Sequence, residues 1–147
     1  MFSITKKYVD YNGVEKEETF WFNLSKRELT GLVYGPAQGL DGVIEEIIQS
    51  GASGRALDLF EEVVLASYGK KMPDGRFAKV DENGRRYADL FKETVVYDDI
   101  IMDMMMNTKS LIAFFNGVVP ADLREKTEEQ TAELEKQLST SGLSVVE

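Results

Sequence analysis

The sequence contains no cysteine and no histidine in its 147 residues. Without cysteine, the chain has no disulfide framework, no thiol nucleophile and no thiolate metal site. Without histidine, it lacks the commonest general base and the commonest metal ligand of proteins. Carboxylates, lysines, tyrosines and hydroxyls remain for chemistry. Because these absences exclude most hydrolase and zinc-site arrangements, we expect a protein that is not an enzyme and binds no metal or cofactor.

Positive charge and long apolar runs are also scarce. The chain has 17 basic and 26 acidic residues, which gives a net charge of −9. This balance disfavours binding to nucleic acids and to anionic membranes, because both require clustered lysine and arginine. No apolar run approaches the roughly 18 residues that cross a membrane, and the first residues lack the apolar core of a signal peptide. We therefore expect a soluble, cytoplasmic protein that can bind a basic partner.

The first 24 residues have the pattern of a β-hairpin. Asn12-Gly13 is the strongest short signal for a two-residue type I′ turn, because both positions adopt positive φ there. Such a loop would place Ile4 opposite Trp21 on the paired strand. The sequence therefore predicts a hairpin over residues 2–24.

Helical signals begin directly after this hairpin. Ser25 and Glu28 have the spacing of a capping box. Gly35-Pro36 would end that helix, and Gly69 would cap a later one. The apolar spacing predicts helices that start at Ser25, run over 41–49, run over 53–68, start near residue 85, follow Thr94 and surround residues 111–118.

The remaining segments read as a connector and a tail. Residues 69–84 are polar and rich in turn residues, so we expect them to connect two helices. Residues 121–147 are charged, and a helix that is polar around most of its circumference gains little by packing. The predicted fold is α+β and predominantly α-helical, with an N-terminal β-hairpin followed by a bundle of five or six short helices. The predicted domains are a single globular domain over 1–120, with hairpin 2–24 and helical part 25–120, and a charged, partly helical, mobile tail over 121–147.

Three segments have a superficial likeness to ligand sites. Asp98, Asp99 and Asp103 could hold a divalent cation, but they also fit a solvated helix face, which we prefer. The run 81–84 lacks the alternating acids of a calcium loop and is interpreted as a turn. The small residues 51–54 lack the lysine of a phosphate-binding loop. We therefore assign no catalytic, cofactor-binding or metal-binding residue.

Four methionines fall in a short helical stretch. Met104 and Met105 share the spacing of the predicted core residues, so we assign them to the core. Met102 and Met106 lie one helical turn apart on the other side. Methionine is over-used on surfaces that bind varied apolar partners, because its side chain is flexible and polarizable. Met102 and Met106 are therefore our hypothesis for a partner-binding surface.

Six short motifs follow one another along the chain: Tyr11-Asn12-Gly13, Phe20-Trp21-Phe22-Asn23-Leu24-Ser25, Ser67-Tyr68-Gly69-Lys70-Lys71, Asp74-Gly75-Arg76-Phe77, Phe91-Lys92-Glu93-Thr94 and Phe114-Phe115-Asn116-Gly117-Val118-Val119-Pro120. This ordered set resembles the tail assembly chaperones of long-tailed bacteriophages. The resemblance covers most of residues 4–125, and the sequence departs from the family in Met72-Pro73 and in the long charged tail.

The resemblance implies a non-catalytic role in phage tail morphogenesis. Such chaperones bind the tape measure protein, a very long helical chain, keep it soluble and help recruit the major tail protein. The resemblance places the protein in the host cytoplasm and outside the mature virion, and it implies that a longer product can arise by ribosomal frameshifting. Self-association is compatible with copies that coat a long client.

Two other functions fit parts of the sequence. A different phage morphogenesis protein, such as a head scaffold or a head–tail component, would form stable rings or stay in the particle. An acidic inhibitor that mimics DNA would need its carboxylates along one elongated face, whereas the acids here are scattered among the predicted helices.

Overall fold

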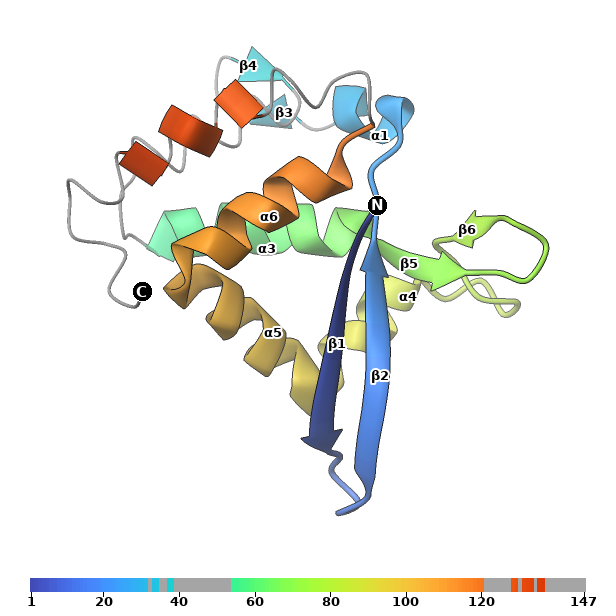
Figure 1. Cartoon of the computed structure of the whole chain (residues 1–147). Helices are drawn as coiled ribbons and strands as arrows, with labels where there is room; N and C mark the ends of the chain where they lie inside the picture. Colours follow the sequence, from blue (N-terminus) through green and yellow to red (C-terminus); the bar gives the residue numbers. More distant parts are fainter. Residues whose placement is uncertain are drawn as a thin grey trace.

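The computed structural model describes residues 1–31, 33–34, 37–38, 54–120, 128–129, 131–133 and 135–136. A long hairpin points downward in Figure 1, and its closed end lies below the helices. The hairpin belongs to a four-stranded antiparallel sheet with the strand order β1-β2-β5-β6. Its strands are β1 (Phe2–Val9), β2 (Glu15–Phe22), β5 (Tyr68–Lys71) and β6 (Phe77–Ala78).

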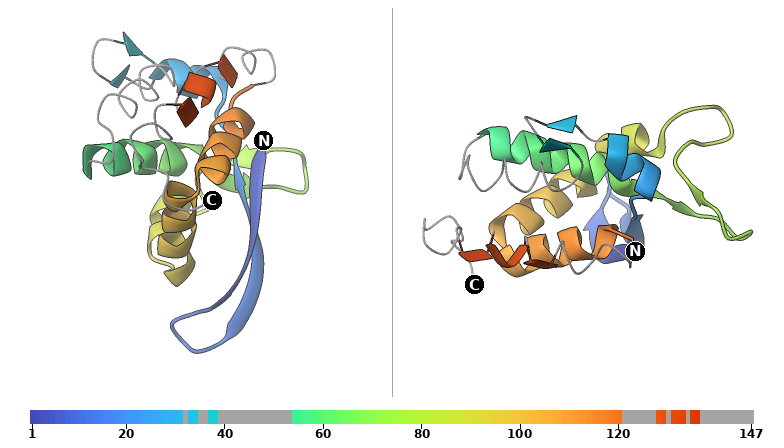
Figure 2. Two further views of the ribbon diagram at one scale, coloured as in Figure 1. Left: turned by 60° about the vertical axis from the view of Figure 1, so that its left-hand side comes forward. Right: turned by 90° about the horizontal axis from the view of Figure 1, so that it is seen from above.

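The helices come from three parts of the chain. A small ribbon of two strands follows the first helix. The elements are α1 (Lys26–Gly31), β3 (Val33–Tyr34), β4 (Ala37–Gln38), α3 (Gly54–Ser67), α4 (Tyr87–Lys92), α5 (Val95–Met106) and α6 (Thr108–Val118). The left view of Figure 2 shows that the closed end of the hairpin extends beyond the helices.

Aromatic side chains join one face of the sheet to the helices. Phe91 of α4 stacks on Tyr68 of β5 with ring centroids 4.3 Å apart, and it also contacts Phe20 of β2 at 5.4 Å. Phe114 of α6 meets Phe22 edge-on at 5.8 Å. Such pairs contribute about 0.5–1.5 kcal/mol each beyond the area that they bury. The core therefore lies between the sheet and the helices, on the face that carries the even-numbered residues of the hairpin.

The hairpin was predicted correctly, but its register was not. Ile4 pairs with Phe20 rather than with Trp21, because the loop has three residues between the closing pair Asp10 and Val14. Within this loop only Gly13 has a positive φ, of 80°, so the loop is not a type I′ turn. A shift of one residue moves every side chain to the other face. The observed register puts Phe20 and the residues that alternate with it into the core.

The predicted fold class is wrong in describing the protein as predominantly α-helical, because the sheet contains two strands more than the N-terminal hairpin. The predicted connector 69–84 supplies strands β5 and β6, so the sheet has four strands and the helices pack on it. Asn23 donates its N–H to the carbonyl of Ser67 at 2.8 Å, which draws the end of α3 alongside β2. These strands depend on pairing with a distant segment, and local propensity does not reveal such pairing.

Two predicted helix ends also differ from the structure. The first helix ends at Gly31, and Val33 lies in a strand rather than in the helix. Helix α3 ends at Ser67, and Gly69 lies in β5 instead of capping the helix. A Cβ at Gly69 would lie 2.7 Å from the carbonyl oxygen of Ala78, so close approach of β6 explains the glycine. The predicted helix over 41–49 falls outside the described residues.

The capping box at the start of α1 is confirmed. Ser25 donates its N–H to Glu28 Oε1 at 2.8 Å, and Glu28 donates its N–H to Ser25 Oγ at 3.1 Å. The two side chains thereby satisfy two backbone donors that the first turn leaves free.

Part of the predicted tail contacts the described core. Thr131 is 1% exposed, and its hydroxyl lies 3.1 Å from the side-chain oxygen of Asn116 in α6. The boundary at residue 120 between a globular domain and a mobile tail stays a prediction.

Candidate functional site

Helix α5 exposes two methionines on the side that faces away from the core. Met102 and Met106 are 48% and 44% exposed, and Asp99 and Asp103 lie within one turn of them. Residues three and four positions apart are neighbours on a helix surface. The four side chains therefore form one surface, which we call the α5 face. It combines two flexible apolar groups with two carboxylates.

The other two methionines belong to the core, as the spacing predicted. Met104 is fully buried, and Met105 is half-buried against the core cluster. Helix α5 thus carries apolar side chains on its core side and also on part of its outer side. A helix that is apolar on more than one side usually has neighbours on both. Among the described residues, Met102 and Met106 have no such neighbour in the core cluster.

The aspartates of α5 do not form a metal site within the described residues. No group of three or more acidic side chains in that part of the chain is arranged to hold a metal ion. Asp98 and Asp99 are exposed, and Asp103 forms an ion pair with Lys6 of β1. The ion pair holds α5 against the hairpin and leaves the methionines uncovered.

The other segments that resembled ligand sites have structural roles where they are described. Asp81 and Gly84 form a tight loop, in which Asp81 Oδ1 accepts hydrogen bonds from the N–H groups of Asn83 and Arg85. Residues 51–53 lie outside the described residues.

Lys71 and Lys70 each lie over an aromatic ring, at 4.2 Å from the centroid of Trp21 and 5.6 Å from that of Tyr87. These lysines are partly engaged within the molecule.

The tip of the hairpin is a second exposed apolar feature, which sequence reasoning missed. Val9, Tyr11 and Val14 are 52%, 78% and 52% exposed. The loop between them is well ordered by hydrogen bonds, because Asp10 Oδ1 accepts from the N–H groups of Asn12 and Val14, both at 2.9 Å. The backbone hydrogen bond from Val14 contributes most to lowering the pKa of the Asp10 carboxyl, and Lys16 at 3.1 Å lowers it further.

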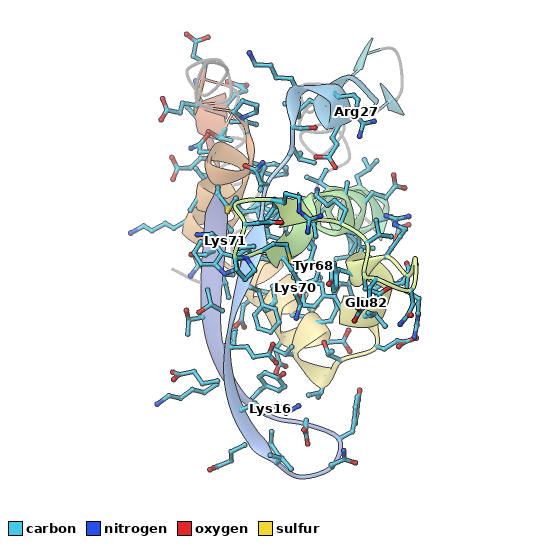
Figure 3. The ribbon with its side chains drawn as sticks, turned by 90° about the vertical axis from the view of Figure 1, so that its right-hand side faces the viewer. Lys16, Arg27, Tyr68, Lys70, Lys71 and Glu82 are labelled. Carbon is cyan, nitrogen blue, oxygen red and sulfur yellow. The ribbon has the colours of Figure 1, made fainter. Side chains whose placement is uncertain are left out.

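A small pocket lies between β2 and α4, and it was also missed from the sequence. Its volume is about 160 Å³. Its lining comprises Glu18, Phe20, Tyr68, Lys70, Tyr87, Leu90, Phe91 and Thr94. In Figure 3, Tyr68 and Lys70 lie beside the upper half of the hairpin, and Lys16 lies farther along it toward the tip. The lining residues are far apart in the sequence, so no local pattern could have indicated the pocket.

Burial and the nearby carboxylate of Glu18 raise the pKa of two tyrosines near this pocket, Tyr68 and Tyr8. Burial, reinforced by the negative charge of Glu18, raises the pKa of Tyr68 to about 12. Burial and a hydrogen bond donated to Glu18 raise the pKa of Tyr8 to about 12 as well. The pocket is thus lined mainly by aromatic and apolar side chains, together with one acidic residue, Glu18, and one basic residue, Lys70.

None of the described helices combines the length and the apolar character that spanning a membrane requires. No curated protein and no solved structure matches the chain. The sequence model of one family matches residues 1–146, and that family is described as phage tail assembly chaperone. This match extends over nearly the whole sequence and agrees with the resemblance of the short motifs. The chain therefore belongs to the phage tail assembly chaperone family.

Proposed function

We propose that this chaperone binds the tape measure protein through the α5 face and keeps it soluble during tail assembly. The observation that carries the proposal is the exposure of Met102 and Met106, at 48% and 44%, on a helix whose other apolar residues from Val96 to Met105 lie in or against the core. A long helical client exposes apolar stripes that aggregate before assembly. Flexible methionine side chains can contact many such stripes, because they adapt to different neighbours.

The charges of the α5 face suit a particular kind of client helix. Asp99 and Asp103 border the methionines, and Asp99 carries no ion pair within the described residues. An amphipathic helix with lysine or arginine beside its apolar stripe would complement this arrangement. The net charge of −9 acts in the same direction and keeps the loaded complex soluble.

The chaperone would act in the host cell while the tail forms, and it would also recruit the major tail protein to the covered tape measure protein. We further propose that it leaves before the virion is complete. Mass spectrometry of purified virions tests this last point, because a retained chaperone would be detected at a fixed ratio to the tail proteins.

The binding proposal is tested by co-expression of the chaperone and the tape measure protein. The double variant Met102→Ser with Met106→Ser should lower the soluble yield of the client and weaken binding of a purified client segment at least about tenfold. Val80→Ser is the matched control, because Val80 is 49% exposed but lies outside α5. Unchanged client solubility in the double variant would contradict the proposed surface.

A further inference from the structure

Strand β2 has an open edge along its outer half. Asp10 donates its N–H to the carbonyl of Val14 across the hairpin. Hydrogen-bonded pairs alternate with non-bonded pairs along antiparallel strands, so Lys16, Glu18 and Phe20 of β2 are the residues that bond to β1. The residues between them, Glu15, Glu17 and Thr19, direct their N–H and C=O groups away from β1. Strand β5 pairs with β2 only at Trp21 and Phe22. Among the described residues, no hydrogen bond satisfies these outward groups of Glu15, Glu17 and Thr19.

The pocket between β2 and α4 borders this open edge. Glu18 and Phe20 line it from β2, while Leu90 and Phe91 line it from α4. Its volume of about 160 Å³ exceeds the roughly 30 Å³ of a water molecule and is below the range of about 300–1,000 Å³ for small-molecule sites. The pocket therefore suits one inserted side chain rather than a whole ligand. An open strand edge beside a side-chain pocket is the arrangement that binds extended peptides by strand addition.

The charge of β2 selects the chemistry of the added strand. Glu15, Glu17 and Glu18 are exposed on the outer half of β2, where Lys16 is the only basic residue. Like charges directly opposite each other destabilise a strand pair, so a second copy of the same edge is disfavoured. A strand that carries lysine or arginine opposite Glu15 and Glu17 is favoured.

We propose that the open edge of β2 and the adjoining pocket bind an extended, basic segment of another protein. The segment pairs with Glu15, Glu17 and Thr19 through its backbone and inserts one apolar side chain over Phe20 and Phe91. This surface is separate from the α5 face and takes a strand instead of a helix. It does not depend on the proposal for the tape measure protein.

The test uses the full chain and a synthetic peptide, acetyl-Thr-Leu-Arg-Val-Lys-Thr-amide. Its antiparallel docking places leucine beside Glu18 and the pocket, and it places arginine and lysine opposite Glu17 and Glu15. Titration followed by NMR should shift the amide signals of Glu17 and Thr19, and the bound peptide should slow their hydrogen exchange. Replacement of leucine by serine should weaken binding at least about tenfold. Absence of binding at millimolar peptide would overturn the proposal.

Two proline variants distinguish this edge from the opposite one. Glu17 and Lys7 face each other across the hairpin, and the N–H groups of both point away from the partner strand. Neither Glu17→Pro nor Lys7→Pro therefore removes a bond between β1 and β2, and proline is tolerated at edges of this kind. Glu17→Pro should bind the peptide about tenfold more weakly than Glu17→Gln, which removes only the charge. Lys7→Pro should bind like Lys7→Gln. A weaker affinity for the peptide in Lys7→Pro alone, or an equal loss of affinity in both proline variants, would refute binding at β2.

Discussion

The ammonium nitrogen of Lys79 lies 3.0 Å from a carboxylate oxygen of Glu28, the residue that completes the capping box of α1. The same nitrogen donates hydrogen bonds to the carbonyls of Asn23, at 3.0 Å, and Ala66, at 2.7 Å. Lys79 therefore joins the start of α1, the end of β2 and the end of α3. Burial lowers the pKa of the Lys79 ammonium, while the hydrogen bond and charge of Glu28 oppose that shift.

Replacing Lys79 by methionine should destabilise the fold by about 1–3 kcal/mol, because two carbonyls and a partly buried carboxylate lose their donor. Urea denaturation followed by circular dichroism measures the change. Lys92→Met is the control, because Lys92 is exposed at the end of α4, and its effect should stay within about 0.5 kcal/mol. Equal stability of the two variants would show that the contacts of Lys79 contribute little.

Replacing Gly69 by alanine should destabilise the protein by about 1–3 kcal/mol through overpacking. The added Cβ would lie 2.7 Å from the carbonyl oxygen of Ala78, and a backbone oxygen cannot move without disturbing the pairing of β5 and β6. Gly75→Ala provides the comparison, because its Cβ would meet no atom within 4 Å and only its φ of 92° would be strained. Thermal unfolding of both variants separates crowding from backbone strain. A smaller effect at Gly69 than at Gly75 would contradict the close packing.

Substitution of the buried methionine of α5 should destabilise the protein much more than substitution of its two exposed methionines. Met104→Ala should cost about 2–5 kcal/mol, because Met104 is fully buried. The double change of Met102 and Met106 to serine should alter stability by about 0.5 kcal/mol or less per site, because both are exposed. Chemical denaturation measures both effects. A large loss of stability in the double variant would assign these two residues to the packing of the protein rather than to binding.

The hairpin tip should be sensitive to acid through Asp10. The N–H of Val14, with Lys16, holds the pKa of Asp10 below its ordinary value in the folded state. The ionised form therefore stabilises the fold above the unfolded-state pKa, and this contribution is lost as the pH falls through the lower folded-state pKa. The variant Asp10→Asn lacks this pH-dependent contribution. The difference in unfolding free energy between the parent protein and the variant should therefore become smaller as the pH is lowered. NMR titration of the Asp10 carboxyl checks the pKa directly, and an unshifted value would refute the assignment.

In the hairpin, the local sequence predicts the position of the turn but not the pairing register of the two strands. Asparagine followed by glycine predicted a reversal at residues 12–13, and the chain does reverse there. Asp10 favours the three-residue loop over a two-residue loop, because its carboxylate accepts hydrogen bonds from the N–H groups of Asn12 and Val14. Burial of Phe20 and Phe22 selects the same register, because a shift of one residue would expose both rings.

The candidate sites were predictable to different extents. Helical spacing alone separated Met102 and Met106 from Met104, because one turn of helix decides which side a residue faces. Their role in binding stays a prediction. The pocket beside Phe20 could not be predicted, because its walls come from β2, β5 and α4. The open edge of β2 likewise exists only because β5 leaves the strand after Gly69 and turns toward β6.

The sequence by itself determined the acidic charge, the absence of thiol and imidazole chemistry, the capping box at Ser25 and the helical spacing of α5 and α6. These are properties of composition or of residues within one turn of each other. Only the tertiary structure decided that residues 68–78 contain two strands, that the carbonyl oxygen of Ala78 packs closely against Gly69, and that Lys79 joins three elements. The reason is physical: strand pairing and burial depend on neighbours distant along the chain, and those neighbours exist only after the chain has folded.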